Sequence, residues 1–104
     1  MANNRIEMFK TALEDDPDNE LARFSLANEL FDDGQYVEAL EHFQLALEHD
    51  AEWMRVYIQI GKCHANSNNK DEALKALEKA RELMVKQNDF ENEMEIQEIL
   101  DELS

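Results

Sequence analysis

The sequence predicts an all-α protein of about six helices arranged as antiparallel pairs. Good helix formers are abundant, whereas the 104 residues include only two Gly and one Pro. Apolar residues recur at helical spacing along most of the chain. The stretch FQLALEHD begins at Phe43 and the similar FKTALEDD begins at Phe9, so the two copies are 43 − 9 = 34 residues apart. A repeat of this length indicates an array of supersecondary units.

The same register continues towards the C-terminus. EAL at 38–40 matches EAL at 72–74, and LA at 26–27 matches IG at 60–61. An amphipathic helix by itself fixes a period of about 3.6 residues rather than 34. Agreement over successive copies therefore indicates a structural repeat.

The first segment, residues 3–19, matches only the second helix of a unit, and its helix is expected over residues 3–15. Arg5 falls where Ala39 and Ala73 fall in register. Ala is needed there because a partner helix packs against it, and without a partner an Arg can face solvent. We interpret this segment as a half-repeat that caps the array. The alternative is that its free side is a dimerisation surface.

Two complete units follow, at 20–53 and 54–87. In the first, helices are expected over 20–33 and 36–49, with Gly34 suited to a left-handed cap between them. In the second, they are expected over 53–66 and 70–86. Asn68 stands where Gly34 stood, and Asn also tolerates positive φ.

The last segment, residues 88–104, predicts one amphipathic helix that caps the second unit. Its apolar side is formed by Phe90, Met94, Ile96, Ile99, Leu100 and Leu103. Its acidic, solvated side is formed by Glu91, Glu93, Glu95, Glu98, Asp101 and Glu102. The alternative is an amphipathic arm for a partner helix.

The repeat resembles the tetratricopeptide repeat, with its pattern W-x₂-L-G-x₂-Y…A-x₃-F…P. In the first unit the pattern falls on Arg23, Leu26, Ala27, Leu30, Ala39, Phe43 and Ala51. In the second it falls on Tyr57, Ile60, Gly61, His64, Ala73, Leu77 and Val85. The small residues fit best, and Arg23, His64 and the missing prolines depart from the pattern. The resemblance implies a right-handed superhelical array and a protein-binding role.

Charge and composition narrow the function. The 25 acidic and 10 basic residues give a net charge of −15, which argues against nucleic-acid and membrane partners. The acidity is interpreted as a solvated surface, with adaptation to high salt as the alternative. A lone cysteine, Cys63, and the polar N-terminus without a signal core favour a cytoplasmic protein.

No residues indicate catalysis, a metal or a cofactor. His42 and His49 lie two turns apart on one helix, about 10 Å by helical rise, which is too far for one zinc ion. Cys63 and His64 are adjacent and point about 100° apart, so they cannot form a nucleophile–base pair directly. Cys63 is expected to be buried. We therefore expect a protein that is not an enzyme.

The resemblance implies a concave groove lined by the first helix of each unit. The predicted partner-binding residues are Leu21, Phe24, Asn28, Phe31, Arg55, Ile58 and Lys62. This face would combine apolar anchors with two basic residues that attract acidic groups. The alternative is that neighbouring helices cover Phe24 and Phe31 and that nearby carboxylates pair with the basic residues. A chaperone-type carboxylate clamp is not predicted, because Phe24 stands where a lysine would be needed.

Two functions stay open on the sequence. The first is an adaptor or scaffold that holds a partner peptide or helix in the groove. The second is a structural unit that forms a homodimer through its terminal helices. The identity of a partner is not encoded in any motif.

Overall fold

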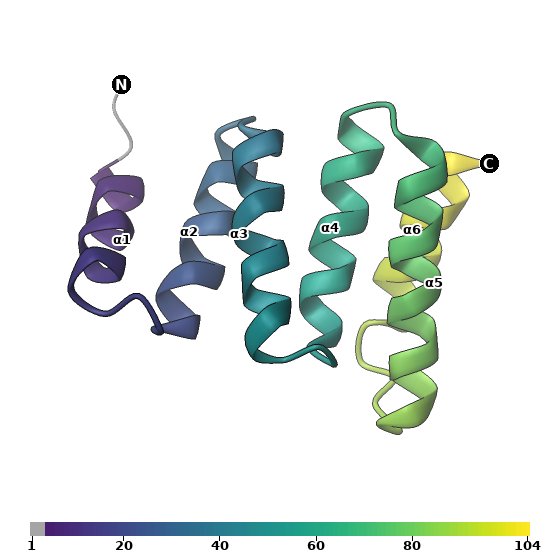
Figure 1. Ribbon diagram of the computed structural model, residues 1–104. Coiled ribbons are helices and arrows are strands. Elements are labelled where there is room, and N and C mark those ends of the chain that lie inside the picture. The colour runs from purple at the N-terminus through teal and green to yellow at the C-terminus, as the bar shows by residue number, and fades with distance from the viewer. Residues whose placement is uncertain (1–3) are drawn as a thin grey trace. The chain divides into compact units, whose positions relative to one another are not determined.

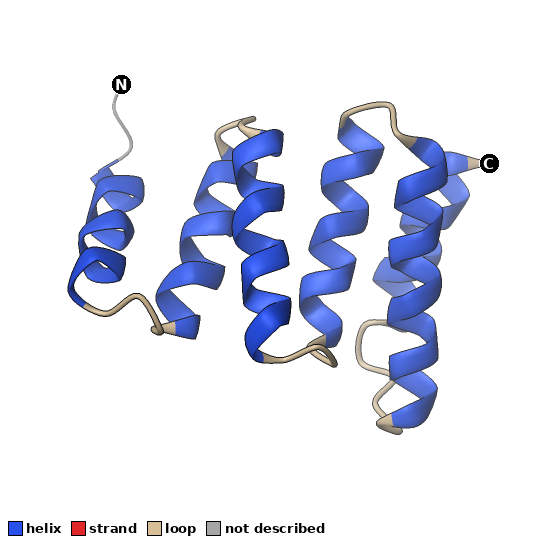
Figure 2. Cartoon of the chain, viewed as in Figure 1, coloured by secondary structure: helices blue, strands red, loops and turns tan. Residues whose placement is uncertain are grey.

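The computed structural model describes residues 4–104, and within this range it contains helices and no strand (Figure 2). The helices are α1 (Asn4–Asp15), α2 (Glu20–Asp32), α3 (Tyr36–His49), α4 (Met54–Asn66), α5 (Lys70–Lys86) and α6 (Glu93–Leu103). The predicted all-α class with six helices is therefore confirmed. The chain divides into two compact units, the first ending at Ala51 and the second running from Glu52 to Ser104.

Unit 1 consists of the pair α2 and α3, with α1 packed against α2 (Figure 1). Phe43 of α3 and Leu26 of α2 are almost fully buried, and α1 contributes Ile6 to the core. The ring of Phe24 meets the Phe43 ring edge-on, with centroids 6.0 Å apart. Such aromatic pairs contribute beyond their buried area.

Unit 2 consists of the pair α4 and α5, with α6 packed against both. Its core is formed by Met54, Ile58, Leu77, Ala80, Leu83, Met84, Ile96 and Ile99. Gly61 lets α4 approach α5 closely, because an added Cβ would lie 2.9 Å from Cγ and Cδ2 of Leu77. The predicted small residues at the helix contacts, Ala27, Ala39, Gly61 and Ala73, are all buried.

Three helices end in the same kind of turn. Gly34, Asn68 and Asn88 have φ values of 80°, 61° and 52°. In each turn the following residue donates its backbone N–H to a carbonyl five residues back, from Gln35 to Leu30, Asn69 to His64 and Asp89 to Met84. These bonds satisfy carbonyls that the helix end leaves free. The sequence predicted the left-handed turns at Gly34 and Asn68 and missed the one at Asn88.

The loop between α1 and α2 supplies a side-chain cap for α2. The side chain of Asn19 caps α2 by accepting a hydrogen bond from the backbone N–H of Ala22 at 3.0 Å.

Arg5 lies in solvent, as predicted, and pairs with Glu29 of α2 at 3.0 Å. Of the helices described, none is both long and apolar enough to cross a bilayer.

Candidate partner-binding surface

The α2 face consists of Leu21, Phe24, Asn28 and Phe31, which share one side of the helix by their i, i+3 and i+4 spacing. Leu21 is 73 % exposed, and the other three are partly exposed. Phe31 also contacts the ring of Tyr36, with centroids 5.5 Å apart. The α2 face is thus a row of mostly apolar side chains. Two of them, Phe24 and Phe31, contact aromatic rings of α3.

The α4 face consists of Arg55, Ile58 and Lys62. This face contacts α6. The guanidinium of Arg55 donates to both carboxylate oxygens of Glu95 on α6, through Nη1 and, at 3.2 Å, through Nη2. Lys62 pairs with the same carboxylate at 2.5 Å, and Arg55 also donates to Oδ1 of Asn92 at 3.4 Å. The two cations that the sequence assigned to a partner are therefore paired with the chain's own last helix.

Electrostatics follow this geometry. The hydrogen bond from Arg55, together with Lys62, lowers the pKa of Glu95 to about 2, although partial burial acts in the opposite direction. The Glu95 carboxylate is therefore ionised in the folded chain near neutral pH. One carboxylate and two cations leave this cluster with one net positive charge.

The position of Ile58 corrects the sequence prediction. Its side chain has no exposed surface, because it packs in the core of unit 2 with Ile96 and Ile99 of α6. Ile58 is thus a core residue and offers no surface to a peptide. The repeat register alone cannot reveal this, since it does not say where α6 packs.

The predicted apolar side of the last segment is confirmed at four residues and differs at two. Those that pack in or against the core of unit 2 are Ile96, Ile99, Leu100 and Leu103. Phe90 and Met94, assigned to the apolar side, are 48 % and 76 % exposed. Glu95, assigned to the solvated side, is the residue that binds Arg55 and Lys62. Glu95 is thus a tertiary contact that the sequence did not predict, since it joins α6 to α4 through Arg55 and Lys62.

A hollow lies between the three helices of unit 1. It has a volume of about 330 Å³ and is lined by Lys10, Leu13, Glu14, Arg23, Leu26 and His42. Arg23 approaches Nδ1 of His42 at 3.1 Å and donates to the carbonyl of Pro17 at 3.0 Å. Burial, and to a lesser extent the charge of Arg23, lowers the pKa of His42. We call this feature the Arg23 hollow.

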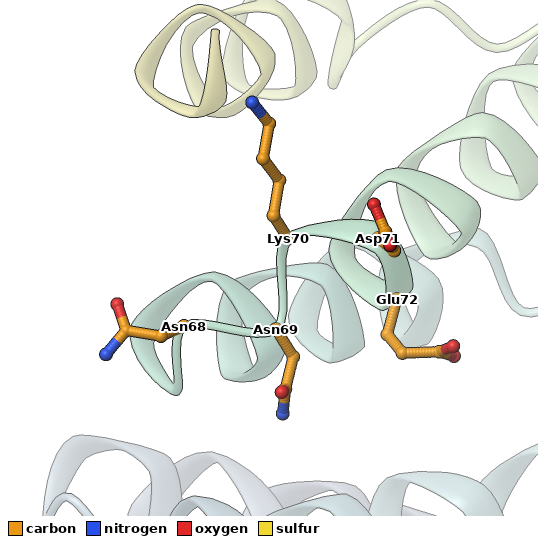
Figure 3. A pocket seen from close by; sticks show the side chains of 5 residues that line it. All are labelled: Asn68, Asn69, Lys70, Asp71 and Glu72. Atoms are coloured by element: carbon orange, nitrogen blue, oxygen red, sulfur yellow. The ribbon is translucent and has the colours of Figure 1, made fainter.

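A second hollow, at the turn between α4 and α5, offers no convergent chemistry. It is lined by Asn68, Asn69, Lys70, Asp71 and Glu72. Figure 3 shows that these side chains point in different directions rather than towards a common point. The turn is explained by the cap of α4 and the start of α5.

Thiol and metal chemistry have no centre among residues 4–104. Cys63 is fully buried, as predicted, and burial raises the pKa of its thiol to about 12. A thiol of this kind is protonated and inert. Within the described range no cluster of three His, Cys, Asp or Glu side chains could hold a metal ion.

These helices, turns and buried small residues define a tetratricopeptide-repeat protein. The model of the family described as Regulator of microtubule dynamics protein 1-3 matches residues 7–104, and the chain belongs to this family. An 85-residue stretch, 82 % of the chain, is 32 % identical to Anaphase-promoting complex subunit 3 of Dictyostelium discoideum. The chain spans 9 % of that protein's length.

Two solved structures share the fold. The TPR2B domain of yeast Sti1, in a complex with pHsp70, has a TM-score of 0.86 and 19 % identity. The match covers 94 % of this chain and 78 % of that one. The MamA RS-1 ArsTM double mutant has a TM-score of 0.72 and 19 % identity, covering 94 % of this chain and 63 % of that one.

Proposed function

We propose that this protein is a non-catalytic interaction module that holds a partner segment on the α2 face. The repeat fold supports a binding role, and a similar repeat domain, that of yeast Sti1, is seen in a complex with pHsp70. One observation carries the choice of surface. Leu21 is 73 % exposed in line with the partly exposed Phe24 and Phe31. Exposed apolar and aromatic side chains in a row are typical of binding faces.

The partner's chemistry follows from the same surface. The α2 face is apolar with one amide, Asn28, and it carries no charge. We therefore propose an extended or helical segment with apolar anchors spaced to contact Leu21, Phe24 and Phe31. Arg55 and Lys62 are assigned to holding α6 rather than to the partner, because both are paired with Glu95.

The test uses two matched variants. Leu21 and Val37 are each the second residue of a helix, and they are 73 % and 76 % exposed. Leu21→Glu changes the proposed surface, and Val37→Glu makes the same chemical change elsewhere in unit 1. We expect quantitative affinity capture to lose its enriched proteins with Leu21→Glu and keep them with Val37→Glu. Equal profiles for both folded variants would exclude the α2 face.

A second candidate function is self-association through the terminal helices. It is favoured by Met8 on α1, 56 % exposed, and by Met94 on α6, 76 % exposed. The net charge of −15 opposes contact between two copies at low salt. Light scattering at micromolar concentration distinguishes the two functions, and a monomer that retains its captured partners supports the interaction module.

A further inference from the structure

The Arg23 hollow carries chemistry that the α2 face does not use. Its side chains come from all three helices of unit 1 rather than from a loop. Leu13 gives it an apolar wall over the buried Leu26, and Lys10 and Arg23 give it two cations. Among the described lining residues the carboxylate is Glu14, and close to the lining lie Glu38, which pairs with Lys10, and Glu41, which acts on His42.

Among residues 4–104 no carboxylate pairs with Arg23. Its contacts are the neutral carbonyl of Pro17 at 3.0 Å and Nδ1 of His42 at 3.1 Å. Nδ1 can accept this hydrogen bond only when the imidazole is neutral there. The two contacts hold the guanidinium in place and leave it with unused N–H donors, since arginine has five. Lys10 is 40 % exposed and contacts Glu38 at 3.5 Å, a long and replaceable ion pair.

The repeat explains why a hollow exists at this point. Arg23 and Tyr57 are register equivalents, because 23 + 34 = 57, and so are His42 and Ala76. In unit 2 the ring of Tyr57 packs on the apolar core. Unit 1 has a guanidinium at the position that an aromatic ring occupies in unit 2. Arg23 thus places a polar head where unit 2 has a ring, and the hollow lies beside this head and Leu13.

We propose that the Arg23 hollow binds a carboxylate carried by an apolar group. Arg23 and Lys10 hold the carboxylate, and Leu13 contacts the apolar part. Arginine is suited to this role because its planar fork matches a carboxylate. Glu14 repels the anion from its own side and directs it to Arg23. The source is a free organic acid or the terminal residue of a partner, and both present the same chemistry.

The experiment titrates the isotope-labelled chain with phenylacetate and, separately, with the neutral phenylacetamide, and follows amide and histidine signals by NMR. We expect saturable shifts at residues around Lys10, Arg23 and His42 with the acid and none with the amide. Arg23→Gln is expected to weaken phenylacetate binding about tenfold, as lost charge-assisted hydrogen bonds commonly do. Arg81→Gln removes the same charge from an exposed site in unit 2 and should leave binding unchanged.

Lys10→Gln provides a second variant if Arg23→Gln does not fold, and a several-fold loss is expected. A peptide ending in Phe, with a free or an amidated carboxyl group, distinguishes the two sources. Tighter binding of the free-acid peptide assigns the site to a partner's terminus, and tighter binding of phenylacetate assigns it to a small acid. Equal shifts with acid and amide, no shifts with the acid, or unchanged binding in both folded variants would overturn the proposal.

Discussion

Units 1 and 2 contain the same helix pair but receive their third helix from opposite ends of the chain. In unit 1, α1 precedes the pair and packs on α2, whereas in unit 2, α6 follows the pair and packs on α4 and α5. Leu21 and Asn28 are the register equivalents of Arg55 and Lys62, since 21 + 34 = 55 and 28 + 34 = 62. In unit 2 these positions bind Glu95 of α6. The repeat register therefore identifies which residues share a helix face. The helix packed beside that face determines which contacts these residues make.

The largest expected effect comes from the core of unit 1. Phe43 is fully buried and contacts the ring of Phe24. Replacing it by Ala should lower the free energy of unfolding by about 3–5 kcal/mol, through lost burial and the cavity that remains. Urea unfolding followed by circular dichroism measures this loss, with the exposed Val37→Ala as the control. A loss below about 1 kcal/mol would contradict the packing described for unit 1.

The next effect separates two equivalent small residues. Gly61 and Ala27 occupy the same register position, because 27 + 34 = 61. Gly61→Ala should destabilise unit 2 by about 1–2 kcal/mol, because overpacking against Leu77 outweighs the gain in helix propensity. Thermal unfolding of Gly61→Ala, compared with that of the wild type, provides the measurement. A more stable variant would show that Leu77 can move aside.

The ion pairs of Glu95 with Arg55 and Lys62 should make the free energy of unfolding depend on pH. The folded-state pKa of Glu95 is about 2, below its ordinary value of 4.5. Its contribution is thus complete above about pH 4.5 and is lost as the pH falls towards 2. Because the side chain is partly exposed, we expect only about 1 kcal/mol. Glu95→Gln should show this loss at pH 7 and a weaker acid dependence. Glu98→Gln, an exposed control on the same helix, should resemble the wild type.

The smallest expected effect comes from His42, which has Ala76 as its equivalent in unit 2. Its pKa is lowered, mainly by burial and further by Arg23, so the unfolded chain binds the proton more readily. The contribution of the neutral imidazole is complete above its ordinary pKa and declines as the pH falls below about 6.5. Urea midpoints at pH 7.5 and 5.5 should differ more for the wild type than for His42→Gln. Equal differences would contradict the lowered pKa of His42.

The sequence predicted what local geometry and close packing require. The six helices, the left-handed turns at Gly34 and Asn68 and the buried small residues follow from backbone conformation and from the repeat. The roles of Glu95 and Ile58 depend on how α6 is rotated about its own axis. Glu95 and Glu98 look alike in the sequence, and only the tertiary contact distinguishes them. The exposure of Met94 was missed for the same reason, whereas Phe90 precedes α6, which begins at Glu93.

Amide hydrogen exchange of α6 in Glu95→Gln, compared with the wild type, measures directly whether the Glu95 ion pairs hold this helix. Because Arg55 and Lys62 hold α6 through Glu95, we predict faster exchange of the α6 amides by about fivefold, which corresponds to about 1 kcal/mol. Exchange in α2 and α3 should stay unchanged, and Glu98→Gln should leave α6 as it is in the wild type. Unchanged α6 exchange in a folded Glu95→Gln variant would show that these ion pairs do not hold α6. Arg55 and Lys62 would then again be candidates for partner binding.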